Sequence, residues 1–146
     1  MNNKYDNRVI IVNSSFGNLI DISMDEVFQE FRELVLSSDA EILFEFNFNQ
    51  KVVNAKHFIG KGKLEEIKRI IDLNKIELII FNHNLSPSQE RNIESFLKTR
   101  VLDRTGLILD IFAKRAFSHI GKLQVELAQL THCLLYTSPS PRDTRR

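Results

Sequence analysis

The stretch from Glu77 to Leu102, ELIIFNHNLSPSQERNIESFLKTRVL, contains a complete strand–helix–strand unit. Apolar runs at Glu77–Phe81 and Arg100–Leu102 predict two strands. Between them, Ser86-Pro87-Ser88-Gln89 supplies an N-cap, a proline at the first helical position and a glutamine at the third, so a helix is predicted to begin there. Two strands joined by one helix predict a right-handed crossover between parallel strands.

Two further apolar runs, at Arg8–Asn13 and Glu41–Phe48, extend this pattern toward the amino terminus. The helix between them is predicted to begin with a capping box formed by Ser23 and Glu26. Apolar residues recur at helical spacing in both intervening segments: Val27, Phe28, Phe31, Leu34 and Val35, and then Leu64, Ile67, Ile70 and Ile71. Strands that alternate with single helices predict an α/β fold, with a small four-stranded, mostly parallel sheet and helices on both faces.

After the last predicted strand the pattern is helical. Thr105 is predicted to cap a helix that carries Leu107 and Ile108 on its apolar side. Further along, an apolar seam at i, i+4 and i+7 is formed by Leu123, Leu127 and Leu130. No strand is predicted after these helices, so the seam needs a partner that the chain does not provide.

The composition argues against a membrane protein, a disulfide-rich protein and a strongly basic nucleic-acid binder. A chain of 146 residues with 42% hydrophobic and 27% charged residues predicts one globular domain. Its apolar runs are far shorter than the ~20 residues that a membrane span requires, so no span is expected. The single cysteine, Cys133, excludes an internal disulfide framework and a cysteine-based zinc site, and a cytoplasmic location is the expectation. A formal charge of +1 argues against a strongly basic nucleic-acid binder, although it is compatible with a local basic face.

The composition changes abruptly at Cys133. Residues 133–143 read CLLYTSPSPRD, hold two of the chain's three prolines and have no helical or strand pattern. This string resembles the conceptual translation of a transposase sequencing adapter, a contaminant at the ends of assembled fragments. The alternative is a natural disordered tail rich in Ser, Pro and Arg. We expect residues 133–146 to be a non-native tail.

Four segments occur in order along the chain: Phe58–Glu66 (FIGKGKLEE), Leu85–Asn92 (LSPSQERN), Val101–Phe112 (VLDRTGLILDIF) and Gly121–Leu130 (GKLQVELAQL). Together, at this spacing, they resemble the HflX family of ribosome-associated GTPases. The sequence departs from the usual family string between Arg115 and Gly121, where Phe117 and Ile120 stand at positions that are commonly polar or charged.

The resemblance implies an amino-terminal α/β domain, then a long helical hairpin, then a GTP-binding domain. It also implies association with the large ribosomal subunit and its RNA, in ribosome separation or rescue, and GTP and Mg²⁺ as cofactors of the intact parent. No G-x-x-x-x-G-K-[ST] motif occurs in the chain, so this polypeptide is expected to hold no cofactor and not to hydrolyse GTP. The expected parts are an α/β domain over 1–117, the start of a truncated hairpin over 118–132, and the tail over 133–146.

Gly60-Lys61-Gly62-Lys63 opens a predicted helix and is the first candidate for contacts to phosphate or RNA. Free amides at a helix start, together with Lys61 and Lys63, can hold a phosphate group. The alternative is structural: the glycines shape a tight connection and the lysines are solvated.

Further candidates follow the last predicted strand. Arg104 lies at the carboxyl end of that strand, the edge where open α/β sheets place ligands. Lys114, Arg115 and Lys122 lie on the helix that leads away and can neutralise RNA phosphates, although a solvated helix face explains them equally well. His83 ends a strand at the same edge, but no nucleophile or carboxylate partner is identifiable for it, so no chemistry is assigned to it.

Three functional hypotheses remain open on the sequence. The first is a binding module, the amino-terminal part of a ribosome-associated GTPase that contacts the large subunit and its own absent GTP-binding domain. The second is a nucleotide-binding α/β domain whose activity is independent of GTP. The third is a stand-alone interaction domain of flavodoxin-like shape. No paired carboxylates and no metal-ligand cluster stand out, which favours binding over catalysis.

Overall fold

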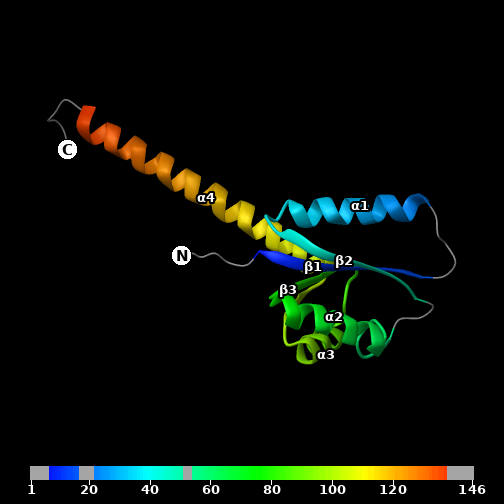
Figure 1. Cartoon of the computed structure of the whole chain (residues 1–146). Helices are drawn as coiled ribbons and strands as arrows, with labels where there is room; N and C mark the ends of the chain where they lie inside the picture. Colours follow the sequence, from blue (N-terminus) through cyan, green and yellow to red (C-terminus); the bar gives the residue numbers. More distant parts are fainter. Residues whose placement is uncertain (1–6, 17–21, 51–53, 138–146) are drawn as a thin grey trace. The chain divides into compact units, whose positions relative to one another are not determined.

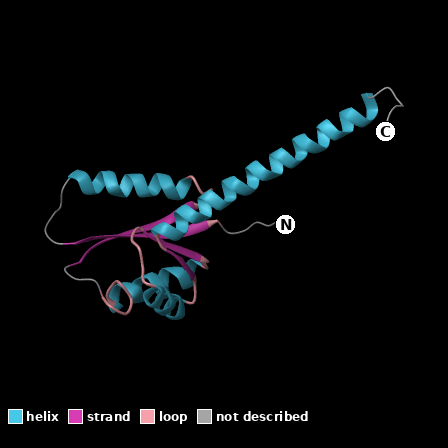
Figure 2. Cartoon of the chain, turned by 180° about the vertical axis from the view of Figure 1, so that it is seen from behind, coloured by secondary structure: helices cyan, strands magenta, loops and turns pink. Residues whose placement is uncertain are grey.

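The computed structural model describes residues 7–16, 22–50 and 54–137. Within these residues strands and helices alternate: β1 (Arg8–Phe16), α1 (Ile22–Leu36), β2 (Glu41–Gln50), α2 (Lys61–Asn74), β3 (Leu78–Phe81), α3 (Pro87–Leu97), β4 (Arg100–Leu102) and α4 (Arg104–Thr137). All strand pairs are parallel and the order is β2-β1-β3-β4. The predicted α/β class is therefore confirmed. Helix α1 covers one face of the sheet, and α2 and α3 cover the other (Figures 1 and 2).

The two central strands are buried on both faces. Ile10 on β1 and Ile79 on β3 belong to the core beneath α2 and α3, whereas the alternate residues Ile11 and Ile80 are equally buried but point to the other side. This explains why both strands read as continuous apolar runs rather than as an alternating pattern.

The connections between strands switch from one face of the sheet to the other at β1 and β3. The connection from β1 leads through α1 to β2 on one side, and the connection from β2 crosses back through α2 to β3 on the other side. The carboxyl ends of β1 and β3 are consequently neighbours at the topological switch point, where open α/β sheets bind ligands.

Most predicted helical stripes are buried as expected. Helix α2 buries Leu64, Ile67 and Ile71, and α3 buries Ile93 and Leu97. In α1, Phe31 and Val35 are fully buried, but Val27, which was predicted on the same stripe, is 42% exposed. The apolar stripe of α1 therefore meets the core only along its second half.

The start of α3 follows the prediction closely. Ser86 is the N-cap, its hydroxyl accepts from the Gln89 amide at 3.1 Å, and the Gln89 side chain accepts from the Ser86 amide at 3.0 Å. Pro87 occupies the first helical position. The capping box at Ser23 is not confirmed, because α1 begins at Ile22 and Ser23 lies inside its first turn.

The start of α4 corrects a prediction. Asp103, and not Thr105, caps this helix: its carboxylate accepts from the Gly106 amide at 2.7 Å, and its carbonyl accepts from the Leu107 amide at 2.9 Å. The shift has a physical reason, since an aspartate directly after β4 reaches the third helical amide, whereas Thr105 is already helical and donates to Asn84 at 2.6 Å.

Helix α4 continues without a break to Thr137. The chain divides into two compact units, residues 1–110 and 111–146, and α4 has residues in both. The predicted seam is present on the second unit, where Leu123, Leu127 and Leu130 are each at least half exposed. The helix also includes residues 133–137, although no helical pattern was expected there, and residues 138–146 lie outside the described part. No helix in the described part is both long and apolar enough to cross a membrane.

We expect Ser86→Ala to lower the free energy of unfolding by about 1 kcal/mol, because it removes the acceptor for the Gln89 amide at the start of α3. Urea denaturation followed by circular dichroism measures the change. Ser88→Ala, at an exposed position two residues further on, is the matched control and should change stability by less than half as much. Equal losses in the two variants would show that the capping box does not stabilise the helix.

Candidate functional site

A polar network joins β1 and the carboxyl end of β3 at the switch point, directly after the last pair of these two strands, Val12 and Phe81. The Asn82 side-chain amide donates to the Asn13 side chain at 2.9 Å, and both residues are buried. The Asn82 oxygen accepts from Arg104 Nη1 at 2.9 Å, while Arg104 Nη2 lies 2.9 Å from the carboxylate of Glu30 on α1. The predicted candidate Arg104 therefore has two guanidinium nitrogens engaged within the domain, and its contact to an external phosphate stays a prediction.

His83 belongs to the same network. Its Nε2 lies 3.0 Å from the Ser14 amide and 2.8 Å from the Ser14 carbonyl, and its ring packs against Phe58 with centroids 5.2 Å apart. Burial lowers the pKa of His83, the hydrogen bond to the Ser14 backbone partly offsets this, and Arg104 lowers the pKa further. The ring thus holds the β1 backbone at Ser14 against the loop after β3, which gives His83 a structural role.

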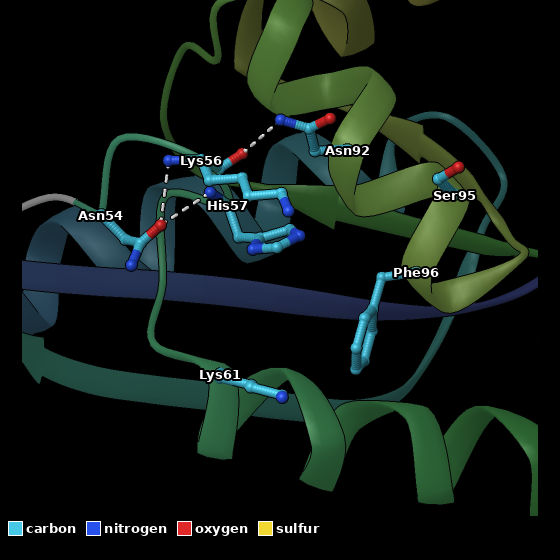
Figure 3. Close-up of a pocket in the computed structure, with 7 residues that line it drawn as sticks. All are labelled: Asn54, Lys56, His57, Lys61, Asn92, Ser95 and Phe96. Atoms are coloured by element: carbon cyan, nitrogen blue, oxygen red, sulfur yellow. Dashed lines mark hydrogen bonds between the residues drawn. The ribbon is translucent and has the colours of Figure 1, made fainter.

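A pocket of about 590 Å³ lies on the face covered by α2 and α3, beside the start of α2 (Figure 3). Its lining comes from the loop before α2, from the first residue of α2 and from one side of α3: Asn54, Lys56, His57, Lys61, Asn92, Ser95 and Phe96. Figure 3 shows Lys61, His57 and Phe96 extending toward the same space from these three elements. The volume lies within the roughly 300–1,000 Å³ typical of small-molecule sites.

The loop that carries Lys56 and His57 is fixed from both sides. Within the loop, the Asn54 side-chain oxygen accepts from the amides of Lys56 and His57, both at 2.9 Å. From α3, Asn92 donates to the Lys56 carbonyl and Gln89 donates to the Asn54 carbonyl, each at 3.1 Å. The pocket wall is therefore held by defined hydrogen bonds before any ligand binds.

The pocket is electropositive. Lys56 and Lys61 are exposed, and within the described part of the chain neither ammonium group has a carboxylate at ion-pair distance. Gly60 caps α2 without any side-chain hydrogen bond, and the first turn of α2 has no acidic residue, so the positive end of the helix dipole is uncompensated. Burial, followed by the charges of Lys56 and Lys61, lowers the pKa of His57.

The structure separates the two lysines that the sequence placed together. Lys61 lines the pocket, but Lys63 turns away from it and places its ammonium group 4.5 Å from the centre of the Phe48 ring. The candidates Lys114, Arg115 and Lys122 are exposed on α4 in the second compact unit. Across the described ranges, no group of three His, Cys, Asp or Glu residues is arranged to hold a metal ion.

Several pocket residues were not predicted from the sequence. Asn54, Lys56, His57, Asn92 and Phe96 were not among the candidates, although Asn92 ends the segment Leu85–Asn92 that contributes to the family resemblance. The available signal was the asparagine at position 54, because asparagine side chains commonly bond the amides that follow them in turns.

We expect the unfolding free energy to fall as the pH is lowered from 8 toward 6, partly because His83 binds a proton more readily in the unfolded chain than in the folded one. The sign follows from the lowered pKa, since His83 in the unfolded chain takes up a proton at a higher pH than His83 in the folded chain. His83→Gln should flatten this slope in urea denaturation. His119→Gln, at an exposed position on α4, should retain it, and an unchanged slope in His83→Gln would contradict the burial of a neutral ring.

Comparison with known proteins agrees with the fold and its order of elements. The family model described as "GTP-binding GTPase N-terminal" matches residues 25–113. The GTPase HflX of Escherichia coli is 50% identical over 107 residues, which are 73% of this chain and 25% of that protein. The GTPase HflX of Caldanaerobacter subterraneus is 46% identical over 110 residues, 75% of this chain and 26% of that protein.

A solved structure extends the likeness. A GTP-binding protein from Sulfolobus solfataricus, in complex with GDP, superposes with a TM-score of 0.56 and 27% identity, over 87% of this chain and 37% of that one. The chain spans about a quarter of the length of the curated relatives it matches. Because the family model matches more than half of its residues, this chain belongs to the HflX family of GTPases and carries the domain that is named for their amino terminus.

Proposed function

We propose that this chain is the ribosome-contacting amino-terminal part of an HflX-type GTP-binding protein, which acts in the cytoplasm on the large ribosomal subunit in ribosome separation or rescue. The observation that carries the proposal is the family match over residues 25–113. GTP and Mg²⁺ would be held by a P-loop domain of the intact protein, and these 146 residues contain no such motif. The role proposed for this chain is therefore binding.

Exposed basic side chains support a contact with RNA. Arg115 and Lys122 are exposed on α4, and in the first unit Lys56 and Lys61 flank a pocket whose described lining residues include no carboxylate. Lysine and arginine side chains that neutralise phosphates release bound counterions, and this release drives association with nucleic acid. Because the formal net charge is only +1, attraction to RNA would come from these local groups and not from the whole molecule.

The exposed seam of α4 supports the second part of the proposal. Leu123, Leu127 and Leu130 would pack against the remainder of the helical hairpin, and the hairpin would join this domain to the GTP-binding domain. The GTP-binding domain is thus the proposed intramolecular partner, and the large subunit with its RNA is the proposed external one.

We expect the full 146-residue chain to co-sediment with purified large ribosomal subunits. The double variant Arg115→Glu/Lys122→Glu should bind roughly tenfold more weakly, and the dependence of log K on log salt should lose about 2 units of slope, because two phosphate contacts are reversed.

The matched control is Arg69→Glu/Lys98→Glu, which makes the same change in net charge at exposed positions of the first unit. It should bind within about twofold of the wild type, since these residues lie outside the proposed contact. Absence of wild-type co-sedimentation at low salt would contradict the proposed function. Equal losses in the two double variants would contradict the assignment of the contact to α4.

A further inference from the structure

The pocket before α2 has three chemical features that occur together. Lys56 and Lys61 supply two ammonium groups, Lys61 is also the first residue of α2, whose start has no side-chain cap, and the rings of His57 and Phe96 form an aromatic wall. The two rings meet edge to face with centroids 5.9 Å apart. Ammonium groups and helix-start amides bind phosphate, and aromatic walls bind the flat faces of bases.

The described lining residues include no acidic group, and this limits the class of phosphate ligand that the pocket can bind. A nucleoside triphosphate is normally bound with Mg²⁺, which takes carboxylate and water ligands, and the described residues that line this pocket include no carboxylate. Two lysines and one helix start instead match the charge of a single phosphate group. A polar rim from Asn54, Asn92 and Ser95 provides donors and acceptors for a sugar or a base edge.

From this arrangement we propose that the pocket binds one unstacked nucleotide carrying a single phosphate, with the phosphate near Lys61 and the start of α2 and the base against Phe96 and His57. Such a nucleotide can come from a single-stranded or bulged segment of RNA, where splayed bases stack on aromatic side chains, or from a free mononucleotide. The RNA source rests on the proposed function. The pocket lies in the first unit and is separate in sequence from the basic residues of α4.

The preformed wall suits a ligand of this kind. Hydrogen bonds from Asn92 and Gln89 already hold the loop, so binding a nucleotide does not require the loop to be ordered first. Of the two lysines at the start of α2, only Lys61 lines the pocket, so the phosphate contact is assigned to Lys61 and not to Lys63.

The test uses the full chain and fluorescence anisotropy of a labelled single-stranded RNA of mixed sequence. Lys56→Ala/Lys61→Ala should weaken binding roughly tenfold and lower the salt slope by about 1, because the phosphate contact is lost. Phe96→Leu keeps apolar volume at the edge of the core while it removes the stacking surface, and it should weaken binding roughly fivefold without changing the salt slope. The control Lys63→Ala/Lys98→Ala removes the same charge outside the pocket and should stay within about twofold of the wild type.

Competition by AMP, GMP, CMP and UMP distinguishes the two sources of ligand. If only unlabelled RNA displaces the labelled RNA, the ligand is a nucleotide within an RNA strand. If a mononucleotide displaces it at the same molar concentration of nucleotide, the ligand is a free mononucleotide. Equal binding by the wild type, both pocket variants and the control would overturn the proposal, as would inorganic phosphate binding as tightly as a mononucleotide. If the pocket variants still co-sediment with large subunits, the proposed function stands whether or not the pocket binds a nucleotide. If the wild type does not co-sediment but binds a mononucleotide in the pocket, only the ribosomal role is rejected.

Discussion

The burial of β1 and β3 on both faces is the constraint on which the rest of the structure depends. Two adjacent parallel strands without a solvent-facing side require helices above and below the sheet, so the chain must cross it in both directions. That requirement places the ends of both strands side by side. There the buried polar side chains Asn13 and Asn82 bond to one another, and Arg104 connects them to α1 and to the start of α4.

The pocket is a second consequence of the same arrangement. Because α2 and α3 cover one face together, the loop that leads into α2 must run against α3, where Gln89 and Asn92 bond to its backbone. Rigid strands and helices thereby position a short surface loop that carries charge and an aromatic ring. At the switch point the described side chains of Asn82, His83 and Arg104 bond to neighbouring groups of the domain, whereas Lys56 and Lys61 line the pocket beside the start of α2.

Local patterns in the sequence were sufficient for most of the fold. Apolar runs located the four strands of the described residues, and the Ser86 box located the start of α3, because capping involves residues only three positions apart. The strand order and the pocket depend on contacts between residues far apart in the chain, such as Asn92 with Lys56, which periodicity does not encode. The cap of α4 was misplaced because Asp103 and Thr105 are both good capping residues, and only the end of β4 decides between them.

Whether this domain belongs to an intact GTP-binding protein of the HflX type is tested most directly by reading the source gene across the codon for Leu130 and beyond. We expect the native frame to depart from residues 133–146 and to continue through a second apolar helix into a G-x-x-x-x-G-K-[ST] motif. A native frame that encodes residues 133–146 and then stops would contradict it, because no GTP-binding domain would follow.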